Sequence, residues 1–311
     1  MISIETTGSD PTVSVLIYGT NKIGKTSFAK DAPSPIFYDS ENSTREIKGA
    51  QRFARLDGAN WTHLLACVDY LITEKHQFKS LAIDTFDWLE QLAWQELLRR
   101  KPSVANGRNV VQCTTIDDYP FFSGYTMVID VWRELLFKLE RLRSVRGMNI
   151  IGTAHAAVRM VENPSGENYE QWDLKLNKHL AGVLREWFDA ILFAEYRTVV
   201  RKKSNFDRGK GVDHEGARVL RTEERLSHRA GNRYSLPYTM DLSWDTFYSH
   251  ARGTETESIE EVTARILERF TGSELEDKAR KGIAKFADVA KLRRFENHLI
   301  SQLPQAKETE E

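Results

Sequence analysis

Short apolar runs alternate with longer amphipathic segments along the first two thirds of the chain. The apolar runs have the length of strands and lie at residues 13–19, 34–39, 79–84, 148–154 and 189–196. They are continuous rather than alternating, which is typical of strands buried on both faces of a parallel sheet. Between them, apolar residues recur at spacings of three and four within 61–71, 89–97 and 131–142, as on one face of a helix. The pattern predicts an α/β fold with a mostly parallel central sheet and crossover helices.

The chain beyond residue 250 has a different pattern, which predicts helices alone. One amphipathic helix is predicted over residues 254–270. A second helix is marked by five apolar residues, Ile283, Phe286, Val289, Leu292 and Leu299. The final residues, KETEE, are expected to fray. We therefore expect an α/β core over 1–250 and a small helical appendage over 251–311.

Composition restricts the class of protein. With 41% hydrophobic residues among 311, the chain can build a substantial core, which excludes disorder as its dominant state. No apolar run approaches the roughly 20 residues of a membrane-spanning helix, and the first residues lack the segments of a secretory signal. Only two cysteines, Cys67 and Cys113, are present. We expect a protein of a reducing cytoplasm with no membrane partner.

Charge gives no general indication of nucleic-acid binding. The 44 basic and 45 acidic side chains leave a net charge of −1, so affinity for a polyanion would have to come from a local patch. Residues 196–233 contain such an excess, with eleven Lys or Arg against five Asp or Glu.

The strongest motif is GTNKIGKT at residues 19–26, directly after the first predicted strand. It satisfies the G-x-x-x-x-G-K-[ST] pattern of a phosphate-binding loop (P-loop). In such a loop backbone N–H groups and the lysine surround the phosphates, and the final hydroxyl holds Mg²⁺. The alternative is an ordinary glycine turn before a helix. The residues predicted to bind ATP are Gly19, Thr20, Asn21, Lys22, Ile23, Gly24, Lys25, Thr26 and Ser27, with Thr26 also predicted to bind Mg²⁺.

Asp84 is the second predicted magnesium residue, because it ends the apolar run at 79–84. A carboxylate at the end of a strand near a P-loop is the usual other half of the metal site. The alternative is that Asp84 or Thr85 caps the following helix. Asp87 is interpreted as an acid in the first turn of that helix.

Two further residues follow predicted strands and are candidates for the chemistry of hydrolysis. Glu41 follows the second strand in PIFYDSE, where a carboxylate can orient and deprotonate a water molecule. Asp39 competes for this role, and a solvated loop charge is the alternative for Glu41. His155 follows the fourth strand, where its side chain can respond to the γ-phosphate.

The motifs together resemble the RecA-like P-loop ATPases, and among them the phage-encoded proteins related to Sak-type and UvsX-type recombinases. The resemblance spans residues 13–245 and is carried by the P-loop with its extra Lys22, by PIFYDSE, by KSLAIDTFDWLE and by NIIGTAHA. It implies that Glu41 is the catalytic glutamate, Asp84 the Walker B aspartate and His155 the γ-phosphate sensor. It also implies that residues 157–178 form a mobile DNA-binding loop.

The same resemblance implies an arginine finger that enters the nucleotide site of a neighbouring subunit. The segment HRAGNRYSLP matches in place, and Arg233 matches the finger arginine. Gly231 stands where the family has a lysine, and Arg229 is the nearest substitute. The alternative for Arg233 is a surface arginine in a turn. A finger supplied in trans implies a homo-oligomer, as a ring or a filament.

Two segments are candidates for contact with single-stranded DNA. Residues 157–178 are not basic, but Tyr169 and Trp172 could stack on bases or pack beneath the loop. The other candidate lies within 196–233, where five cations cluster, namely Arg201, Lys202, Lys203, Arg208 and Lys210. The first function predicted is a DNA-stimulated ATPase of phage recombination or strand annealing. The alternatives are a helicase-like or packaging motor, and a nucleotide switch that binds a protein partner through its C-terminal helices.

Overall fold

The computed structural model describes residues 12–54, 60–164, 166–201, 210–252, 259–272 and 274–284, and residues 286, 292, 295, 296 and 299. The chain divides into two units, residues 1–247 and 248–311, and each is described by itself. The boundary expected at residue 250 falls inside helix α6 (Trp244–Arg252).

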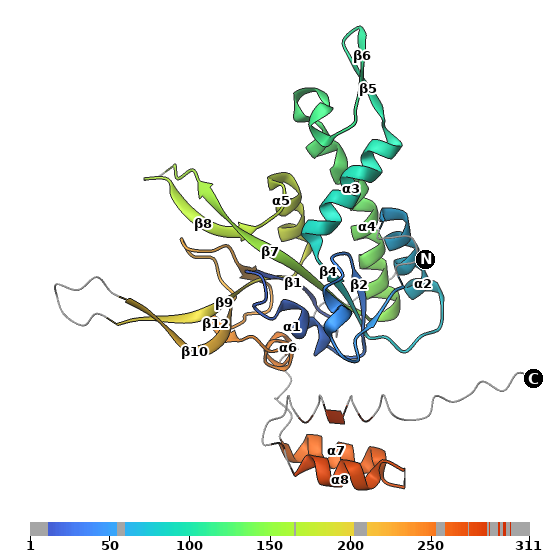
Figure 1. Ribbon diagram of the computed structural model, residues 1–311, viewed down its shortest axis with the longest axis vertical. Coiled ribbons are helices and arrows are strands. Elements are labelled where there is room, and N and C mark those ends of the chain that lie inside the picture. The colour runs from blue at the N-terminus through green and yellow to red at the C-terminus, as the bar shows by residue number, and fades with distance from the viewer. Residues whose placement is uncertain are drawn as a thin grey trace, which may run out of the picture. The chain divides into compact units, whose positions relative to one another are not determined.

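The first unit contains an extended sheet with helices packed on it (Figure 1). Its strands are β1 (Ser14–Gly19), β2 (Pro35–Asp39), β3 (Gln51–Arg52), β4 (Ser80–Asp84), β5 (Ser103–Asn106), β6 (Asn109–Gln112), β7 (Asn149–Val161), β8 (Tyr169–Leu174), β9 (Ala190–Arg201), β10 (Lys210–Arg221), β11 (Gly231–Asn232) and β12 (Thr239–Asp241). Its helices are α1 (Lys25–Lys30), α2 (Trp61–Thr73), α3 (Phe86–Arg100), α4 (Gly124–Arg146) and α5 (Lys178–Trp187), followed by α6. Short 3₁₀ turns lie at Ser43–Glu46, Ile116–Asp118 and Pro120–Phe122.

The main sheet has the strand order β12-β10-β9-β1-β7-β4-β2-β3, with β8 paired to β7 and β11 paired to β9. From β9 to β3 each neighbouring pair along this order is parallel, whereas β10 and β12 are antiparallel additions at one side. The expected α/β fold with a mostly parallel sheet is therefore confirmed, and all five predicted strands are present. The P-loop strand β1 lies between β7 and β9, far from its neighbours in sequence.

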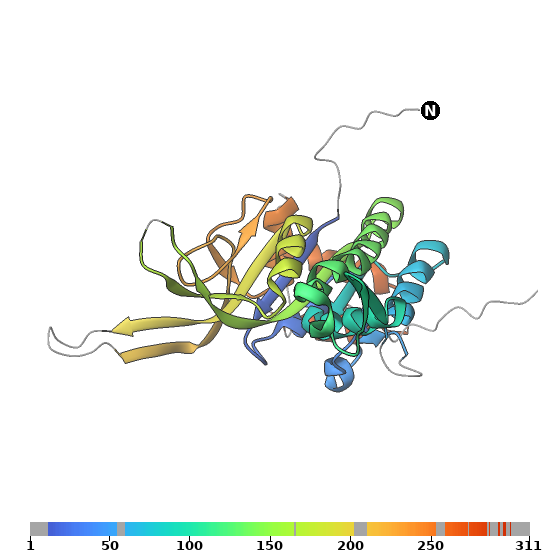
Figure 2. The same ribbon diagram turned by 90° about the horizontal axis from the view of Figure 1, so that it is seen from above.

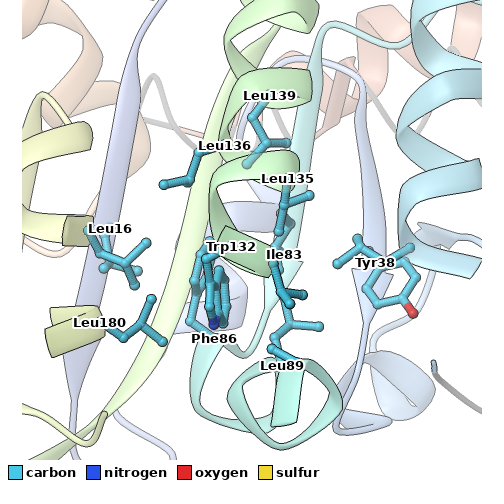
Figure 3. Close-up of a cluster of buried hydrophobic side chains, with 14 of the residues drawn as sticks. Leu16, Tyr38, Ile83, Phe86, Leu89, Trp132, Leu135, Leu136, Leu139 and Leu180 are labelled. Carbon is cyan, nitrogen blue, oxygen red and sulfur yellow. The ribbon is translucent and has the colours of Figure 1, made fainter. Parts of the chain in front are cut away.

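Burial on both faces explains why the predicted strands are continuous apolar runs. On β1, Leu16 and Tyr18 belong to a cluster with side chains of α2, α3, α4 and α5, which Figure 3 shows around Trp132 and Phe86. Val15 and Ile17 alternate with them, point to the other face of the sheet and are also fully buried.

Aromatic rings also join α1 to α6. The ring of Phe28 lies 5.5 Å from that of Trp244 and 5.8 Å from that of Phe247, measured between ring centroids. Helix α1, which follows the P-loop, is therefore held in place by packing although it has only six residues.

Two expectations about the fourth strand and the segment after it are wrong. The predicted strand at 148–154 continues to Val161, so His155 lies within β7 rather than after it. Residues 157–178 do not form a loop, since the end of β7 pairs with β8 from Ala156–Leu174 to Val161–Tyr169 as an antiparallel hairpin. Exposed and half-buried side chains alternate from Ala157 to Val161, as in a strand with one exposed face. The P-loop sheet therefore extends directly into a projecting hairpin (Figure 2).

A second long hairpin is formed by β9 and β10. Both views show it extending on the same side of the unit as the β7–β8 hairpin (Figures 1 and 2). Arg201 and Lys210 belong to its strands, whereas Lys202, Lys203 and Arg208 lie outside the described residues.

The second unit contains α7 (Ile259–Phe270) and α8 (Glu276–Ile283). The predicted helix over 254–270 is confirmed from Ile259 onward, and its Val262, Ile266 and Phe270 are buried. Of the second predicted helix, Leu292 and Leu299 are helical, whereas Ile283 ends a separate helix, α8, and Phe286 is not helical; Val289 lies outside the described residues. Leu292 and Leu299 join the same apolar cluster. Among the described residues, no helix has both the length and the apolarity needed to cross a membrane.

A buried carboxylate joins α3 to the start of α5. Glu90 Oε1 accepts a hydrogen bond of 2.8 Å from the backbone N–H of Asn177, which caps α5. Burial raises the pKa of Glu90 to about 7, and the hydrogen bond from Asn177 and the charge of Arg159 only partly oppose this. Ionisation of Glu90 therefore costs the folded state free energy.

We expect Glu90→Gln to remove a pH dependence of stability. In the wild type, the free energy of unfolding should fall as the pH rises from 4.5, the ordinary pKa, through about 7, the folded-state pKa. Glutamine can still accept from Asn177 but cannot ionise, so the variant should be more stable near pH 8 by on the order of 3 kcal/mol and equal near pH 4. Urea unfolding across this range measures the difference, and a variant less stable near pH 8 would contradict the expectation.

Candidate nucleotide-binding site

The carboxyl ends of the central strands bring most of the predicted site residues to one edge of the sheet. In the strand register, Asp39 at the end of β2 is opposite Asp84 at the end of β4. Gly19 at the end of β1 is opposite His155 on β7 and Ala194 on β9. Ligands of open α/β sheets bind at this edge, so strand order alone assembles a candidate site.

Backbone geometry explains two residues of the P-loop. A Cβ atom at Gly19 would lie 2.4 Å from the carbonyl oxygen of Ala194, so β9 could not pair so closely with a larger residue. Gly24 has φ of +114°, which L side chains rarely adopt. Ile23 between them is 0% exposed. The buried Ile23 side chain thus anchors the loop. Ile23 can therefore contact a ligand only through its backbone.

Lys25 is buried at the start of α1, and its ammonium group closes the loop. Its Nζ donates to the carbonyl oxygens of Gly19 at 3.0 Å and Thr20 at 2.9 Å. Burial lowers the pKa of Lys25, and the charges of Asp84, Asp87 and Glu41 oppose that shift. One ammonium therefore lies among three carboxylates, close to the backbone that would surround a phosphate.

Asp84 is the point where four segments of the site meet. Its carboxylate is 1% exposed and accepts a hydrogen bond of 2.9 Å from Thr26 Oγ1. It also accepts from Ser43 Oγ after β2 and from Thr153 Oγ1 on β7. The N-cap residue of α3 is Thr85 rather than Asp84. The Thr85 side chain makes no capping hydrogen bond to the helix.

The Thr26 hydroxyl and the Asp84 carboxylate fit the binding of Mg²⁺. Both are oxygen donors, and Mg²⁺ in nucleotide sites takes few protein ligands because water and phosphate oxygens supply the others. Among the described residues, no cluster of three or more His, Cys, Asp or Glu side chains could hold a metal by itself. When bound, Mg²⁺ neutralises charge on the phosphates.

The structure distinguishes between Asp39 and Glu41. The Asp39 carboxylate is buried and accepts hydrogen bonds from the backbone N–H groups of Ser43 and Thr44, at 3.0 and 2.9 Å, and from Arg52 at 3.2 Å. Its oxygens are therefore occupied in shaping the turn after β2. Glu41 is half-buried at the apex of this turn, which leaves it as the candidate base.

The environment of Glu41 matches that assignment. Burial raises the pKa of Glu41, while His155 lowers it; the charges of Asp84 and Asp87 add to the rise. A carboxylate with a raised pKa is a stronger base toward water. Glu41 is also close enough to Lys25 and His155 for their charges to lower its pKa.

His155 is held by Asp87, a pairing that the sequence did not reveal. The Nδ1 atom of His155 lies 2.8 Å from Asp87 Oδ2, and its backbone N–H donates to Oδ1 at 3.0 Å. Burial acts to raise the pKa of Asp87, but the hydrogen bonds from His155 outweigh it and leave that pKa lowered. Asp87 lies in the first turn of α3, as expected, and it also orients the candidate sensor.

Arg233 lies at the opposite edge of the sheet from the P-loop. Its neighbour Asn232 pairs with Ala190 at the start of β9, whereas Gly19 pairs with Ala194. The Arg233 guanidinium is 61% exposed and pairs with Asp189 at 2.9 Å. Arg229, the considered substitute for the missing lysine, lies 3.5 Å from Asp173.

The aromatic residues considered for base stacking are only partly available. The ring of Trp172 stacks on Phe193 at 6.1 Å with an interplanar angle of 23°, so it packs beneath the β7–β8 hairpin. Tyr169, near the hairpin tip, is half-buried. Val158 and Met160 are the exposed apolar side chains of this hairpin, at 48% and 63%.

Three residues near the P-loop were not predicted from the sequence. Ser43 and Thr153 are hydroxyl residues that lie beside strand ends and bind Asp84. Arg218 on β10 donates to the carbonyl oxygen of Ile23. Their types are common, and only the pairing of strands distant in sequence brings them to the P-loop.

The fold and the site define an α/β protein of the P-loop NTPase class. Residues 12–234 match the model of the AAA domain family, and because the match covers most of the chain, the protein belongs to that family. It is thus a P-loop ATPase, for which nucleotide binding is the common property. No curated protein matches the chain.

We expect Asp87→Asn and His155→Ala to lower ATP turnover by the same mechanism. Asp87 acts by holding His155, so each change should reduce kcat by roughly tenfold or more. The kcat of the double variant should be no lower than that of the less active single variant. The Kd for ATP should change by less than about threefold, because the backbone of the loop is untouched. Steady-state kinetics and calorimetry measure both quantities.

Asp130→Asn is the matched control, since Asp130 is exposed on α4 and pairs only with its helical neighbour Arg133 among the described residues. It should leave turnover unchanged. Fully additive losses in the double variant would show that Asp87 and His155 act separately.

Proposed function

We propose that this protein is a Mg²⁺-dependent ATPase of RecA-like type that binds single-stranded DNA, in phage-type recombination or strand annealing, and acts as a homo-oligomer. One observation carries the proposal, namely the convergence of Lys25, Thr26, Asp84, Glu41 and His155 on the carboxyl edge of the sheet. These are a phosphate-binding cation, a hydroxyl–carboxylate pair for Mg²⁺, a base and a sensor. These are the groups that one subunit would contribute to hydrolysis of a phosphoanhydride.

Each side chain has a defined task in this proposal. Lys25 exchanges its bonds to the carbonyl oxygens of Gly19 and Thr20 for phosphate oxygens. Glu41 orients the attacking water and takes its proton, because its carboxylate is half-buried and the competing Asp39 is occupied. His155 stays oriented by Asp87 and contacts the γ-phosphate side.

DNA binding is supported by the two hairpins that leave the sheet at the nucleotide edge. Strand β7 is continuous from Thr153, which binds Asp84, to Val161 in the first hairpin. The second hairpin, β9–β10, has Arg201 and Lys210 on its strands, and the other three cations of that cluster lie between these two in the sequence. Cations on a projecting hairpin can contact a phosphate backbone, and exposed Val158 and Met160 can contact bases. A change at the γ-phosphate would reach the first hairpin through β7 itself.

Oligomer formation is supported by the position of Arg233. The start of β9 is four residues from the level of the P-loop, or about 13 Å along the strand. Arg233 therefore cannot reach the γ-phosphate of its own subunit without leaving Asp189. It lines two adjoining surface pockets of about 420 and 240 Å³, where a neighbouring molecule could approach it.

Single-stranded DNA should stimulate ATP hydrolysis, and the stimulation should grow with protein concentration. We expect Lys25→Ala to abolish tight nucleotide binding and turnover without unfolding the chain, because it removes the charge that meets the phosphates. Turnover with and without single-stranded DNA, across protein concentration, tests ligand and assembly together. Lys30→Ala, at the end of α1, is the matched control and should retain activity.

Each other outcome has a specific meaning. Unchanged hydrolysis by Lys25→Ala would remove the site assignment. ATP-dependent unwinding of duplex DNA would favour the motor alternative. Hydrolysis that ignores DNA at every concentration would favour the nucleotide switch.

Mixing two inactive variants should restore part of the activity. Glu41→Gln removes the base from a subunit's own site, and Arg233→Ala removes the finger that the subunit offers to its neighbour. A mixed junction can contain an intact Glu41 and an intact Arg233, so turnover should exceed that of either variant alone. Assays across mixing ratios measure this, and no recovery in assemblies shown to contain both variants would argue against a shared site.

A further inference from the structure

Arg218 is brought to the P-loop by an irregularity in β10. The pairing of β10 with β9 shifts between Asp213, which is opposite Thr198, and Arg218, which is opposite Tyr196. Gly216 in this interval has φ of +72°. A bulge of this kind redirects the side chains that follow it. Here the residue redirected is an arginine, two strands away from β1 in the sheet.

The Arg218 side chain packs on the last turn of the P-loop. Its Nη1 donates to the carbonyl oxygen of Ile23 at 3.1 Å. A Cβ atom at Gly24 would lie 2.5 Å from Nη1 and 3.2 Å from the Leu242 side chain. Leu242 is itself tied to β10, since its backbone N–H donates to the carbonyl oxygen of Arg218 at 3.1 Å. Gly24 is therefore covered from the β10 side.

This contact determines how one peptide group of the loop is turned. In a trans peptide, the C=O of one residue and the N–H of the next point in opposite directions. Because Arg218 holds the Ile23 carbonyl toward β10, the N–H of Gly24 points away from β10. A glycine can adopt several backbone conformations, and Gly24 here has a φ of +114°. The contact with Arg218 favours this one conformation.

We propose that Arg218 is a positioning residue of the nucleotide site, which fixes the Ile23–Gly24 peptide so that the N–H of Gly24 is ready to donate to a diphosphate or triphosphate. The proposal rests on the proposed nucleotide-binding function. It gives the β9–β10 hairpin a direct connection to the P-loop through its own strand. A side chain at Gly24 would displace the Arg218 guanidinium from this position, in addition to the strain that its φ of +114° imposes.

The charge of Arg218 strengthens this role. Among the side chains that the structure describes, no carboxylate forms an ion pair with its guanidinium. The charges of Asp84, Asp87 and Glu41 act on Lys25, so they partly offset its attraction for a polyphosphate. An arginine at hydrogen-bond distance from the loop raises the local potential without entering that cluster.

Calorimetry of ADP and ATP binding tests the proposal. Arg218→Ala should weaken both ligands equally, by about tenfold, which corresponds to about 1.4 kcal/mol. Arg218→Lys keeps a donor and a charge and should recover most of the loss. In turnover, KM for ATP should rise while kcat falls by less than about twofold, because a loop amide contacts substrate and transition state alike. The melting temperature without nucleotide should stay at the wild-type value.

Arg197→Ala is the matched control, since Arg197 is an exposed arginine on β9, one residue from the partner of Arg218, and it should leave affinity unchanged. The inference is overturned if Arg218→Ala binds ADP as tightly as the wild type, or if Arg197→Ala weakens binding as much. It is also overturned if the loss in Arg218→Ala comes with an equal fall in stability and no recovery by lysine. Failure of the wild type itself to bind ADP would instead reject the proposed function.

Discussion

The buried carboxylate of Asp84 connects the parts of the candidate site. It accepts hydrogen bonds from the P-loop helix through Thr26, from the turn after β2 through Ser43 and from β7 through Thr153. A buried carboxylate is costly unless its oxygens are satisfied, so these segments are held at fixed positions around it. The turn that carries Glu41 and the strand that carries His155 thereby share a common reference point with the P-loop. Strand register supplies the rest, because Asp39 is level with Asp84, and Gly19 is level with His155 two residues further toward the same edge of the sheet.

Charge balance is the second constraint on the site. Lys25 interacts with Asp84, Asp87 and Glu41, so the protein groups alone favour a cation over an anion. A nucleotide polyphosphate can bind there only if more positive charge accompanies it. The Thr26–Asp84 pair suits Mg²⁺, and Arg218 lies at the outer side of the loop. In the proposed function, the site therefore binds nucleotide and metal together rather than nucleotide alone.

The same strands that build the site also leave it as projecting hairpins. Strand β7 passes from Thr153 and His155 into its hairpin with β8 without a break, and β10 carries Arg218 at the base of its hairpin with β9. Rigid strands transmit a displacement at one end to the other more directly than loops do. In the proposed function, the state of the nucleotide is thus linked to both candidate DNA contacts by backbone rather than by long side-chain networks.

The sequence by itself determined the local features. Continuous apolar runs predicted all five core strands, and the spacing of glycines, lysine and threonine at 19–26 predicted the P-loop, because strand burial and loop conformation depend on neighbouring residues. Only the tertiary structure decided between Asp39 and Glu41, since the two differ in which distant donors occupy their oxygens. It alone paired His155 with Asp87 and brought Arg218 to Ile23, and it placed Arg233 at the far edge of the sheet. Those relations depend on strand order and register, which are set by contacts between segments remote in sequence and leave no pattern along the chain.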